Sequence, residues 1–522
     1  MRRRLKGDSW RYLRFWQRET DMTSPAHNTP THNTPSDMTA LRDAVAAGTT
    51  TAESICAGML AVTAERNTEI NAFHEVFAEH ALEAARRVDS DARAGRPLPP
   101  LAGMPIAIKD NVATTLGRTT CSSRMLENYR SPFDATAVER LAHAGAVVMG
   151  KTNMDEFAMG SSGEHCKWGP VRNPWDKTRV PGGSSAGSAA AVAGGMCAAA
   201  IGSDTGGSIR QPASFCGIVG LKPTYGRISR WGLVAFGSSL DQIGPMTRSV
   251  RDAALMLDVM SGIDERDSTT ADRPPTELAK TVERPIEGLR VGIPRQYMSD
   301  ANDSEVNAAV NAAADAYRAL GATIVSVELP LTDVGISTYY VIAPAEASSN
   351  LARYDGIRYG HRAQLQPGED LFTLYARSRS EGFGPEVQRR IMLGTYMLSS
   401  GYYDAYYKRA LQVRRRIKQE FDQAFSACDV LLGPTAPTPA FGFGANSDPL
   451  AMYLCDVYTV NTNIAGICGV SIPAGFAERN GKHLPIGVQL QANAFEEDRL
   501  LRAARMLERA LTATTSAHAP RV

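Results

Sequence analysis

The sequence predicts an α/β protein with a single large domain, in which helices cover both faces of a mixed β-sheet. Helical patterns alternate along the chain with short apolar runs that are typical of buried strands. Neither an internal repeat nor a convincing linker divides the chain, apart from a polar stretch at 264–285. The 522 residues are 43% hydrophobic and 21% charged, as in ordinary soluble globular proteins. These observations favour one α/β layer architecture over several small domains.

Residues 1–37 differ in composition from the rest of the chain. They combine an arginine-rich start, an aromatic patch and a polar stretch that repeats His-Asn-Thr-Pro. No apolar segment with a small-residue cleavage site follows the basic residues, which argues against a targeting peptide. We expect a disordered extension here, or a translation start that belongs at Met22 or Met38. The folded domain is then expected over 38–522.

The expected elements follow in order from Thr39. Gly48 ends a first helix, and Thr50 to Glu53 forms a capping box that begins a second one. Further helices are expected over 75–94, 135–144 and 308–320, within 384–427, and over 496–511. Strands are expected over 101–108, 146–149, 291–294, 323–327 and 430–433.

The charge balance and the cysteines exclude several classes of protein. Lys and Arg total 56 against 55 for Asp and Glu, which leaves a net charge of +1 and no sign of general attraction to nucleic acid or membranes. No apolar run reaches the roughly 18 residues that span a bilayer. The eight cysteines show no C-x-x-C spacing and no histidine cluster beside them. We therefore expect reduced core thiols and no metal site.

Two motifs match known patterns but not their mechanisms. The stretch Gly145 to Thr152 fits the P-loop expression, yet the residues between its glycines form the apolar strand itself and not a loop that cradles phosphate. The stretch Gly183 to Gly187 fits the G-x-S-x-G nucleophile elbow, which needs a buried strand before it and a catalytic histidine late in the chain. Polar, proline-containing sequence precedes it, and His483 lies in a polar turn.

Two segments carry residues with catalytic chemistry. Lys109 follows the apolar strand expected at 101–108, where burial should lower its pKa and leave a neutral amine that acts as a base. A lysine that extends from the strand end to solvent is the alternative.

Ser184 and Ser185 lie in a glycine-rich turn, where glycines permit close approach to a substrate. A flexible linker is the alternative there, but the Ala-rich run that follows is typical of a buried helix.

A third segment, residues 202–213, follows an apolar run and begins with a glycine-rich turn that ends in Ser208. Successive backbone N–H groups at Thr205, Gly206 and Gly207 would form an oxyanion hole beside a serine nucleophile. An anion-binding nest or a plain turn also fits these residues.

Taken together and in this order, the three segments resemble the amidase-signature family. The resemblance implies that Ser208 is the nucleophile that forms an acyl-enzyme, and that Ser184, held by a cis peptide after Gly183, relays its proton. It implies that Lys109 is the neutral base at the end of the relay. This agrees with the chemistry, since a serine is a weak nucleophile until a base takes its proton. The supporting residues implied are Asp204, Arg210 and Ser185.

Longer matches narrow the resemblance to one group of that family, the A subunits of glutamyl-tRNA(Gln)/aspartyl-tRNA(Asn) amidotransferases. They lie at 154–160, 211–245, 345–356, 389–394, 399–407 and 448–453. The group implies a cytoplasmic protein that hydrolyses glutamine and passes ammonia to a partner. A B subunit binds the mischarged tRNA and uses ATP and Mg²⁺, and a small C subunit completes a heterotrimer. The glutamine-hydrolysing component itself is expected to need no cofactor and no metal.

The resemblance also implies a glutamine pocket. Arg389 should bind the α-carboxylate and Asp456 the α-amino group, with Tyr340 or its neighbour Tyr339 in the same pocket. An arginine clamp and an aspartate acceptor suit a zwitterionic amino acid. Without the resemblance, a solvated helix charge is the preferred interpretation of Arg389. The main alternative function is a stand-alone amidase that hydrolyses small amides with the same Ser-Ser-Lys set.

Overall fold

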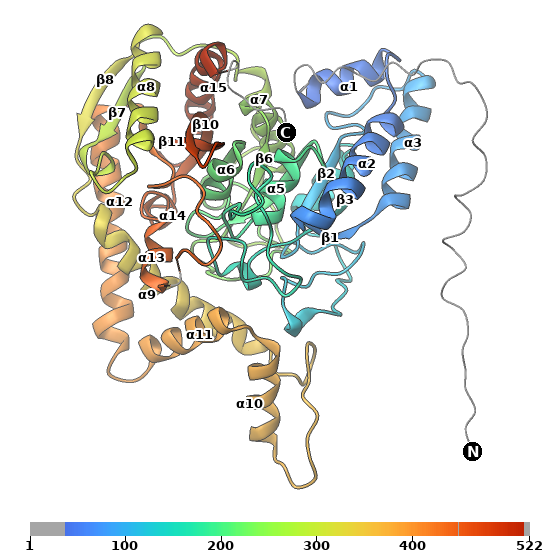
Figure 1. Cartoon of the computed structure of the whole chain (residues 1–522), viewed down its shortest axis with the longest axis vertical. Coiled ribbons are helices and arrows are strands. Elements are labelled where there is room, and N and C mark those ends of the chain that lie inside the picture. The colour runs from blue at the N-terminus through green and yellow to red at the C-terminus, as the bar shows by residue number, and fades with distance from the viewer. Residues whose placement is uncertain (1–36, 447, 516–522) are drawn as a thin grey trace. The chain divides into compact units, whose positions relative to one another are not determined.

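The computed structural model describes residues 37–446 and 448–515 of the chain. The extension expected over 1–37 therefore lies outside the described residues, except for Asp37. The described part forms an eleven-stranded mixed sheet in the order β1-β3-β2-β4-β6-β5-β10-β11-β9-β7-β8. Figure 1 shows the N-terminal strands at one end of this sheet and β7 and β8 at the other. The expected α/β class with a mixed sheet is confirmed.

The strands are β1 Phe73–Val76, β2 Pro105–Lys109, β3 Val147–Thr152, β4 Ala199–Asp204, β5 Val219–Lys222, β6 Gln242–Thr247, β7 Arg290–Pro294, β8 Thr323–Val327, β9 Val430–Pro434, β10 Cys468–Arg479 and β11 Lys482–Ala492. The α-helices are α1 Met38–Ala46, α2 Ala52–Ile70, α3 Ala78–Arg93, α4 Thr136–His143, α5 Ala186–Ala193, α6 Arg210–Cys216, α7 Val250–Met260, α8 Ser304–Ala319, α9 Thr332–Asn350, α10 Leu371–Gly382, α11 Pro385–Leu398, α12 Arg409–Ala427, α13 Pro449–Leu454, α14 Val460–Ile464 and α15 Glu497–Thr515. A π-helical turn, η6 Tyr403–Lys408, precedes α12.

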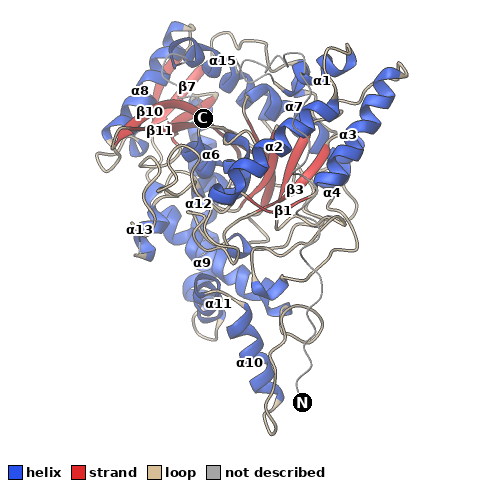
Figure 2. Cartoon of the chain, turned by 45° about the vertical axis from the view of Figure 1, so that its right-hand side comes forward, coloured by secondary structure: helices blue, strands red, loops and turns tan. Residues whose placement is uncertain are grey.

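Helices pack on both faces of the sheet, as Figure 2 shows. The alternation of side chains along β2 separates the two cores, because successive strand residues point to opposite faces. Ile106 and Ile108 join a cluster that contains residues of α4, α7, α8 and α15. Ala107 joins a second cluster that contains residues of α5 and α6. Lys109 has the parity of Ala107 and so belongs to the face on which α5 and α6 pack.

The sheet brings the three chemical segments to one edge. Strands β2, β3 and β4 run parallel, with Lys109 opposite Thr152 and Ile108 opposite Ile201. The carboxyl end of β4 leads through residues 205–208 into α6, and α5 begins directly after Ser185. The crevice at the carboxyl ends of parallel strands is the usual place for a site in open α/β sheets.

Several elements differ from their expected bounds. The hairpin of β10 and β11 was not predicted; its turn, Asn480-Gly481, has positive φ at both residues, which suits a tight hairpin. His483 lies in β11, paired with Glu478, and not in the turn. The helix expected over 75–94 begins later, at Ala78, because the preceding residues form strand β1.

The long helices expected within 384–427 are present as α11 and α12, with a break between them. α11 ends at Leu398, Gly401 has a φ of +86°, and α12 begins at Arg409 after the π-helical turn. The motif at 145–152 behaves as expected from its apolar residues, since 147–152 form strand β3. Lys151 is fully buried within it and its ammonium donates to the carbonyl oxygen of Val112.

All eight cysteines carry free thiols, and seven of them are buried. No group of three or more metal-ligating side chains occurs within 37–446 and 448–515. In the same ranges, no helix combines the length and the apolar character that a bilayer crossing requires.

Candidate active site

Lys109 is the fully buried end of strand β2, and three serine hydroxyls surround its side-chain nitrogen. The Nζ atom lies 2.8 Å from Ser184 Oγ, 2.9 Å from Ser185 Oγ and 2.9 Å from Ser203 Oγ. Burial lowers the pKa of Lys109 to about 7, while the nearby carboxylate of Asp155 opposes that shift. A substantial fraction of this lysine is therefore uncharged at neutral pH.

The hydroxyls around Lys109 differ in what they already bind. Ser185 Oγ donates to the carbonyl oxygen of Ser203 at 3.2 Å, so it is free to accept a hydrogen bond from Lys109. Ser203 Oγ accepts from Asn111 Nδ2 at 2.9 Å and can accept from the lysine as well. A neutral amine has two N–H groups and one lone pair. With the N–H groups directed to Ser185 and Ser203, the lone pair faces Ser184 Oγ and can accept its proton.

Ser184 lies in an irregular loop that joins the 173–181 stretch to α5, and the peptide bond between Gly183 and Ser184 is cis. A side chain at position 183 is excluded, because a Cβ there would lie 2.0 Å from Asp155 Oδ2. The backbone N–H of Gly183 donates to Gln211 Oε1 at 3.0 Å. The carbonyl of Ser184 accepts from the N–H of Asp155 at 3.2 Å. These contacts fix the backbone that presents the Ser184 hydroxyl to Lys109.

Ser208 lies in the turn between β4 and α6 and is 8% exposed. Its carbonyl accepts the N–H of Ser185 at 3.2 Å, which ties the two serine loops together. Its hydroxyl makes no hydrogen bond to any residue that the structure describes. Catalytic hydrogen bonds often tighten only when substrate is bound. The structure thus brings the predicted Ser184 and Lys109 into contact and places Ser208 on the adjoining loop; their catalytic roles stay predictions.

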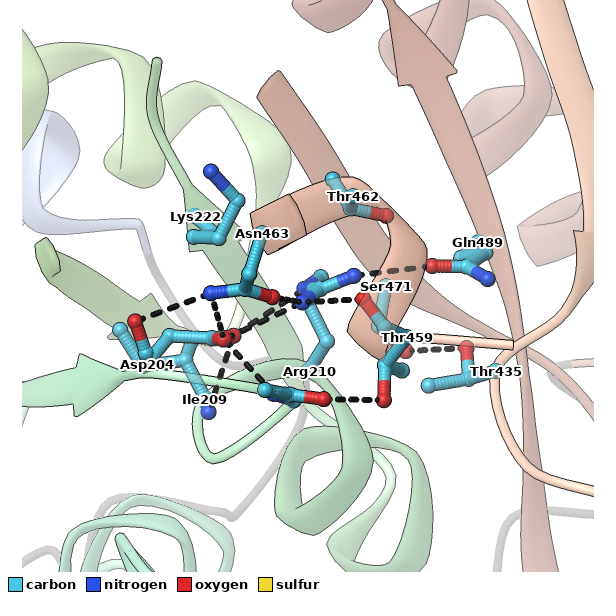
Figure 3. A network of polar contacts seen from close by, with 12 residues as sticks. Asp204, Ile209, Arg210, Lys222, Thr435, Thr459, Thr462, Asn463, Ser471 and Gln489 are labelled. Carbon is cyan, nitrogen blue, oxygen red and sulfur yellow. Dashed lines mark hydrogen bonds and ion pairs between the residues drawn. The ribbon is translucent and has the colours of Figure 1, made fainter. Parts of the chain in front are cut away.

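Asp204 and Arg210 form a fully buried ion pair that shapes the turn of Ser208 (Figure 3). Arg210 donates from Nε to Asp204 Oδ2 at 3.0 Å and from Nη2 to Oδ1 at 3.1 Å. Burial alone would raise the pKa of Asp204, but the guanidinium holds it below its ordinary value. Asn463 accepts from Arg210 at 2.6 Å and donates to Asp204 at 3.0 Å. Asp204 and Arg210 therefore hold the backbone turn that carries Ser208, and their supporting role in catalysis stays a prediction.

The backbone N–H groups of the turn are not equivalent. The N–H of Gly207 donates to Asp204 Oδ1 at 2.8 Å, so it is already occupied. Those of Thr205, Gly206 and Ser208 donate to no group in the described part of the chain and remain open for an oxyanion. Gly207 has a φ of +144°, and a Cβ there would lie 2.2 Å from a side-chain oxygen of α14's N-cap residue, Thr459. The geometry favours Thr205 and Gly206 over Gly207 as donors.

The predicted amino-group ligand, Asp456, lies buried beside the nucleophile turn. Its Oδ2 accepts the hydroxyl of Ser161, whereas its Oδ1 finds no hydrogen-bond partner among the described residues. A Cβ on Gly207 would lie 3.2 Å from that Oδ1. Burial raises the pKa of Asp456 to about 7, because no cation pairs with it directly. An unpartnered, buried carboxylate oxygen at this place suits a cationic group of a substrate.

Both predicted tyrosines lie at the same site. A Cβ on Gly206 would lie 2.7 Å from the Tyr339 ring, so Tyr339 borders the oxyanion turn. Tyr340 stacks on Tyr453 with ring centroids 3.6 Å apart, and the guanidinium of Arg390 lies 5.2 Å from the Tyr340 centroid. Two tyrosines of α9 thus pack together with aromatic and cationic residues of α11 and α13 beside the turn of Ser208.

Two neighbouring arginines of α11 differ in their surroundings. The side chain of Arg389 is 47% exposed and pairs with Glu386. Arg390 is buried, donates to the other oxygen of Glu386 at 2.8 Å and packs against Phe236, Tyr340 and Tyr453. The predicted carboxylate clamp, Arg389, is therefore the more exposed of the two, while Arg390 is held among aromatic side chains.

Sequence reasoning missed four residues of the site: Ser203, Ser161, Gln211 and Arg390. Ser203 directly precedes Asp204 in a glycine- and serine-rich run, so its hydroxyl was hidden among similar residues. The i, i+4 spacing of Glu386 and Arg390 was a readable signal of a helical ion pair. Ser161 and Gln211 carry no signal of their own, because their partners lie far away in sequence.

The family model "Amidase" matches residues 56–501. The A subunit of the glutamyl-tRNA(Gln) amidotransferase from Synechococcus sp. (strain WH7803) is 58% identical over 443 residues, 84% of this chain and 90% of that protein. The crystal structure of the corresponding A subunit from Thermotoga maritima is 42% identical and superposes with a TM-score of 0.72, covering 88% of this chain and 91% of that one. A peptide amidase from Stenotrophomonas maltophilia is more distant, with 30% identity and a TM-score of 0.77 over 91% of this chain and 96% of that one.

The family match covers well over half of the chain, and the similarity to the A subunits extends over nearly their full length. The fold, the buried lysine with its serines and the sequence identity point the same way. The chain belongs to the amidase family and, within it, to the glutamyl-tRNA(Gln) amidotransferase A subunits.

Proposed function

We propose that this chain is the glutaminase subunit of a tRNA-dependent amidotransferase. It hydrolyses the side-chain amide of glutamine through an acyl-enzyme on Ser208 and supplies the ammonia that converts Glu-tRNA(Gln) to Gln-tRNA(Gln). The observation that carries the proposal is the 2.8 Å contact between a buried, partly neutral Lys109 and Ser184, next to the turn of Ser208. The relatives named as amidotransferase A subunits support the choice of substrate.

The proposed reaction moves one proton along the serines and back. Lys109 Nζ takes the proton of Ser184, which takes that of Ser208, and Ser208 Oγ bonds to the amide carbon. The resulting oxyanion is held by open N–H groups at 205 and 206. Collapse breaks the C–N bond, and the proton returns through Ser184 to the leaving nitrogen, which departs as ammonia. Water then hydrolyses the acyl ester to glutamate, activated by the same lysine.

The partners of the proposed complex are a B subunit that binds the mischarged tRNA and uses ATP and Mg²⁺, and a small C subunit. The near-neutral net charge of this chain supports the proposal that the B subunit makes most of the contacts with the tRNA. Amidation of Asp-tRNA(Asn) is a second reaction that the same ammonia supply serves. A cytoplasmic location follows from a role in translation. No cofactor is assigned to this chain.

A trapping experiment tests the acyl-enzyme. With hydroxylamine in place of water, glutamine should yield γ-glutamyl hydroxamate, and Ser208→Ala should abolish this product. Ser214→Ala is the matched control, because Ser214 lies on α6, the helix that follows Ser208, and its hydroxyl accepts the N–H of Gly487 at 2.9 Å. Hydroxamate formation by the Ser208→Ala enzyme would overturn the assignment of the nucleophile.

A second experiment separates the proposed function from a stand-alone amidase. The chain is co-expressed with the candidate B and C proteins, and glutaminase activity of the purified complex is measured with and without mischarged tRNA and ATP. Co-purification and a rise of activity with tRNA and ATP support the amidotransferase. A chain that purifies alone and hydrolyses simple amides as fast as glutamine would instead be an amidase of the peptide-amidase kind.

A further inference from the structure

The Asp456 carboxylate has one hydrogen-bond donor and one open oxygen. Only the hydroxyl of Ser161 donates to its Oδ2, and Oδ1 lies beside Gly207 without a partner in the described structure. Asp456 is only 6% exposed and Ser161 only 4%. A buried carboxylate with a single donor can rotate about its side-chain torsions unless that donor holds it. The direction of Oδ1 therefore depends on Ser161.

Ser161 is in turn held by the catalytic loops. Its carbonyl accepts from Gln211 Nε2 at 2.8 Å, and Gln211 Oε1 accepts the N–H of Gly183 at 3.0 Å. Gln211 is fully buried and lies on α6, three residues after the nucleophile. A Cβ on Gly182 would lie 2.4 Å from Gln211 Oε1, so this part of the loop closely surrounds the amide. The Gln211 side chain thus connects helix α6, on which it lies, with the loop of Ser184 and with the loop of Ser161.

We propose that Ser161 is a positioning residue of the amino-acid pocket: its hydroxyl orients Asp456 so that Oδ1 faces the α-ammonium group of glutamine. Gln211 sets the place of Ser161 relative to the two catalytic serines. The hydrogen bonds from Asp456 through Ser161 and Gln211 to Gly183 therefore connect the site that binds the amino group with the loop that positions the reacting amide. This inference rests on the proposed glutaminase function and specifies which groups select an α-amino acid amide over a simple amide.

The test uses two substrates and the assembled amidotransferase. L-Glutamine carries the α-ammonium, whereas glutaramate, the monoamide of glutaric acid, has the same side chain and carboxylate without it. In Ser161→Ala we expect kcat/KM for glutamine to fall about tenfold through KM, the effect of losing one hydrogen bond to a charged group. The kcat for glutamine and the kcat/KM for glutaramate should change less than about twofold, because neither depends on the ammonium contact.

Two further variants keep the result specific. Ser162→Ala removes the neighbouring buried hydroxyl, which accepts the N–H of Glu164 at 3.3 Å and does not contact Asp456, so it should leave both substrates unaffected. Ser161→Thr keeps a hydroxyl on the same carbon and should restore the KM for glutamine at least in part. Equal losses for both substrates in Ser161→Ala, or no change in KM for glutamine, would overturn the inference.

A binding measurement separates this inference from the proposed function. The Kd of glutamine is measured by calorimetry in the Ser208→Ala background, with Asp456→Asn and Ser161→Ala added one at a time. Weaker binding in both supports the inference. If Asp456→Asn weakens binding and Ser161→Ala does not, Ser161 has no positioning role and the pocket stands. If Asp456→Asn leaves binding unchanged, Asp456 does not bind the ammonium group and the inference is overturned, whereas the proposed function fails only if the Ser208→Ala protein itself binds no glutamine.

Discussion

At the scale of single residues, the protonation of Lys109 decides when the catalytic set can work. The lysine acts as a base only when it is uncharged, and burial lowers its pKa to about 7. The neutral fraction therefore falls as the pH falls through 7. We expect kcat for glutamine to rise toward a plateau above about pH 8 and to drop about tenfold per pH unit well below the pKa. A kcat profile that stays flat from pH 5 to 9 would remove Lys109 from this role.

The carboxylate of Asp155 is expected to tune that lysine. It is buried, accepts the N–H groups of Gly163 and His165 at 3.0 to 3.1 Å, and raises the pKa of Lys109 against the effect of burial. Asp155→Asn keeps an acceptor oxygen but removes the charge, so the acid limb of the kcat profile should move to lower pH. Asp252→Asn, a buried carboxylate that holds Met38, is the control and should leave the limb in place. An unmoved limb in Asp155→Asn would mean that Asp155 is uncharged while the enzyme works.

The residues that the sequence could predict are those with local signals. A lysine after an apolar strand and serines in glycine-rich turns indicate their chemistry before any fold is known, and the structure places Lys109 and Ser184 in contact. Ser161 and Gln211 could not be found in this way, because their partners Asp456 and Gly183 are brought to them only by the folded chain. The occupied N–H of Gly207 likewise depends on the position of a carboxylate and not on the motif.

At the scale of elements, helix α11 carries two neighbouring arginines with different expected roles. Arg390 is expected to stabilise the fold, and Arg389 is expected to bind substrate. Arg390 forms a buried ion pair, so Arg390→Met should lower the unfolding free energy by about 2 kcal/mol, since Glu386 stays buried and keeps only the half-exposed Arg389 as a cationic partner. Arg389 is half-exposed, and Arg389→Met should cost less than about 1 kcal/mol. The same Arg389→Met change should raise the KM for glutamine if Arg389 binds the α-carboxylate. Thermal unfolding and glutamine kinetics on both variants check this; an unchanged KM in Arg389→Met would refute the clamp.

The success of element prediction followed the strength of local patterns. The strands at 291–294 and 323–327 were found because they are short apolar runs with clear ends. The hairpin of β10 and β11 escaped because Pro473 and Gly475 interrupt its pattern, and its stability comes from pairing with β5 and β9 on either side. The long helices expected within 384–427 are α11 and α12, and only the boundary between them was not predicted, because the π-helical turn after Gly401 has no distinct sequence pattern.

At the scale of the whole molecule, the described domain begins at Asp37. Its carboxylate accepts the N–H of Ala40 at 2.7 Å as the N-cap of α1 and pairs with Arg251 at 3.3 Å. The next residue, Met38, is buried at 2% exposure and its N–H donates to Asp252 at 2.9 Å. The first residues of the domain are therefore part of its packing.

A pair of shortened chains tests this boundary. A chain that begins with a starting methionine followed by Asp37 should keep the thermal stability and glutaminase activity of the full chain. The same shortened chain with Asp37→Ala and Met38→Ala should lose about 3 kcal/mol, because it lacks the N-cap and the buried Met38 side chain. The melting temperatures of the two chains measure the difference. Equal melting temperatures would show that the Asp37 cap and the Met38 side chain contribute nothing to the stability of the domain.

The three hydroxyls around Lys109 have one more consequence. Because Ser185 and Ser203 are placed to take its two N–H groups, folding alone aims the lone pair at Ser184. A lysine in water would have to shed and reorder its hydration shell before it could receive a proton. Here that reorganisation is complete before glutamine arrives, so little of the activation energy is spent on rearranging dipoles. The arrangement makes the base directional as well as weakly basic, and the direction is set by the backbone of strand β4 and of the loop that leads into α5.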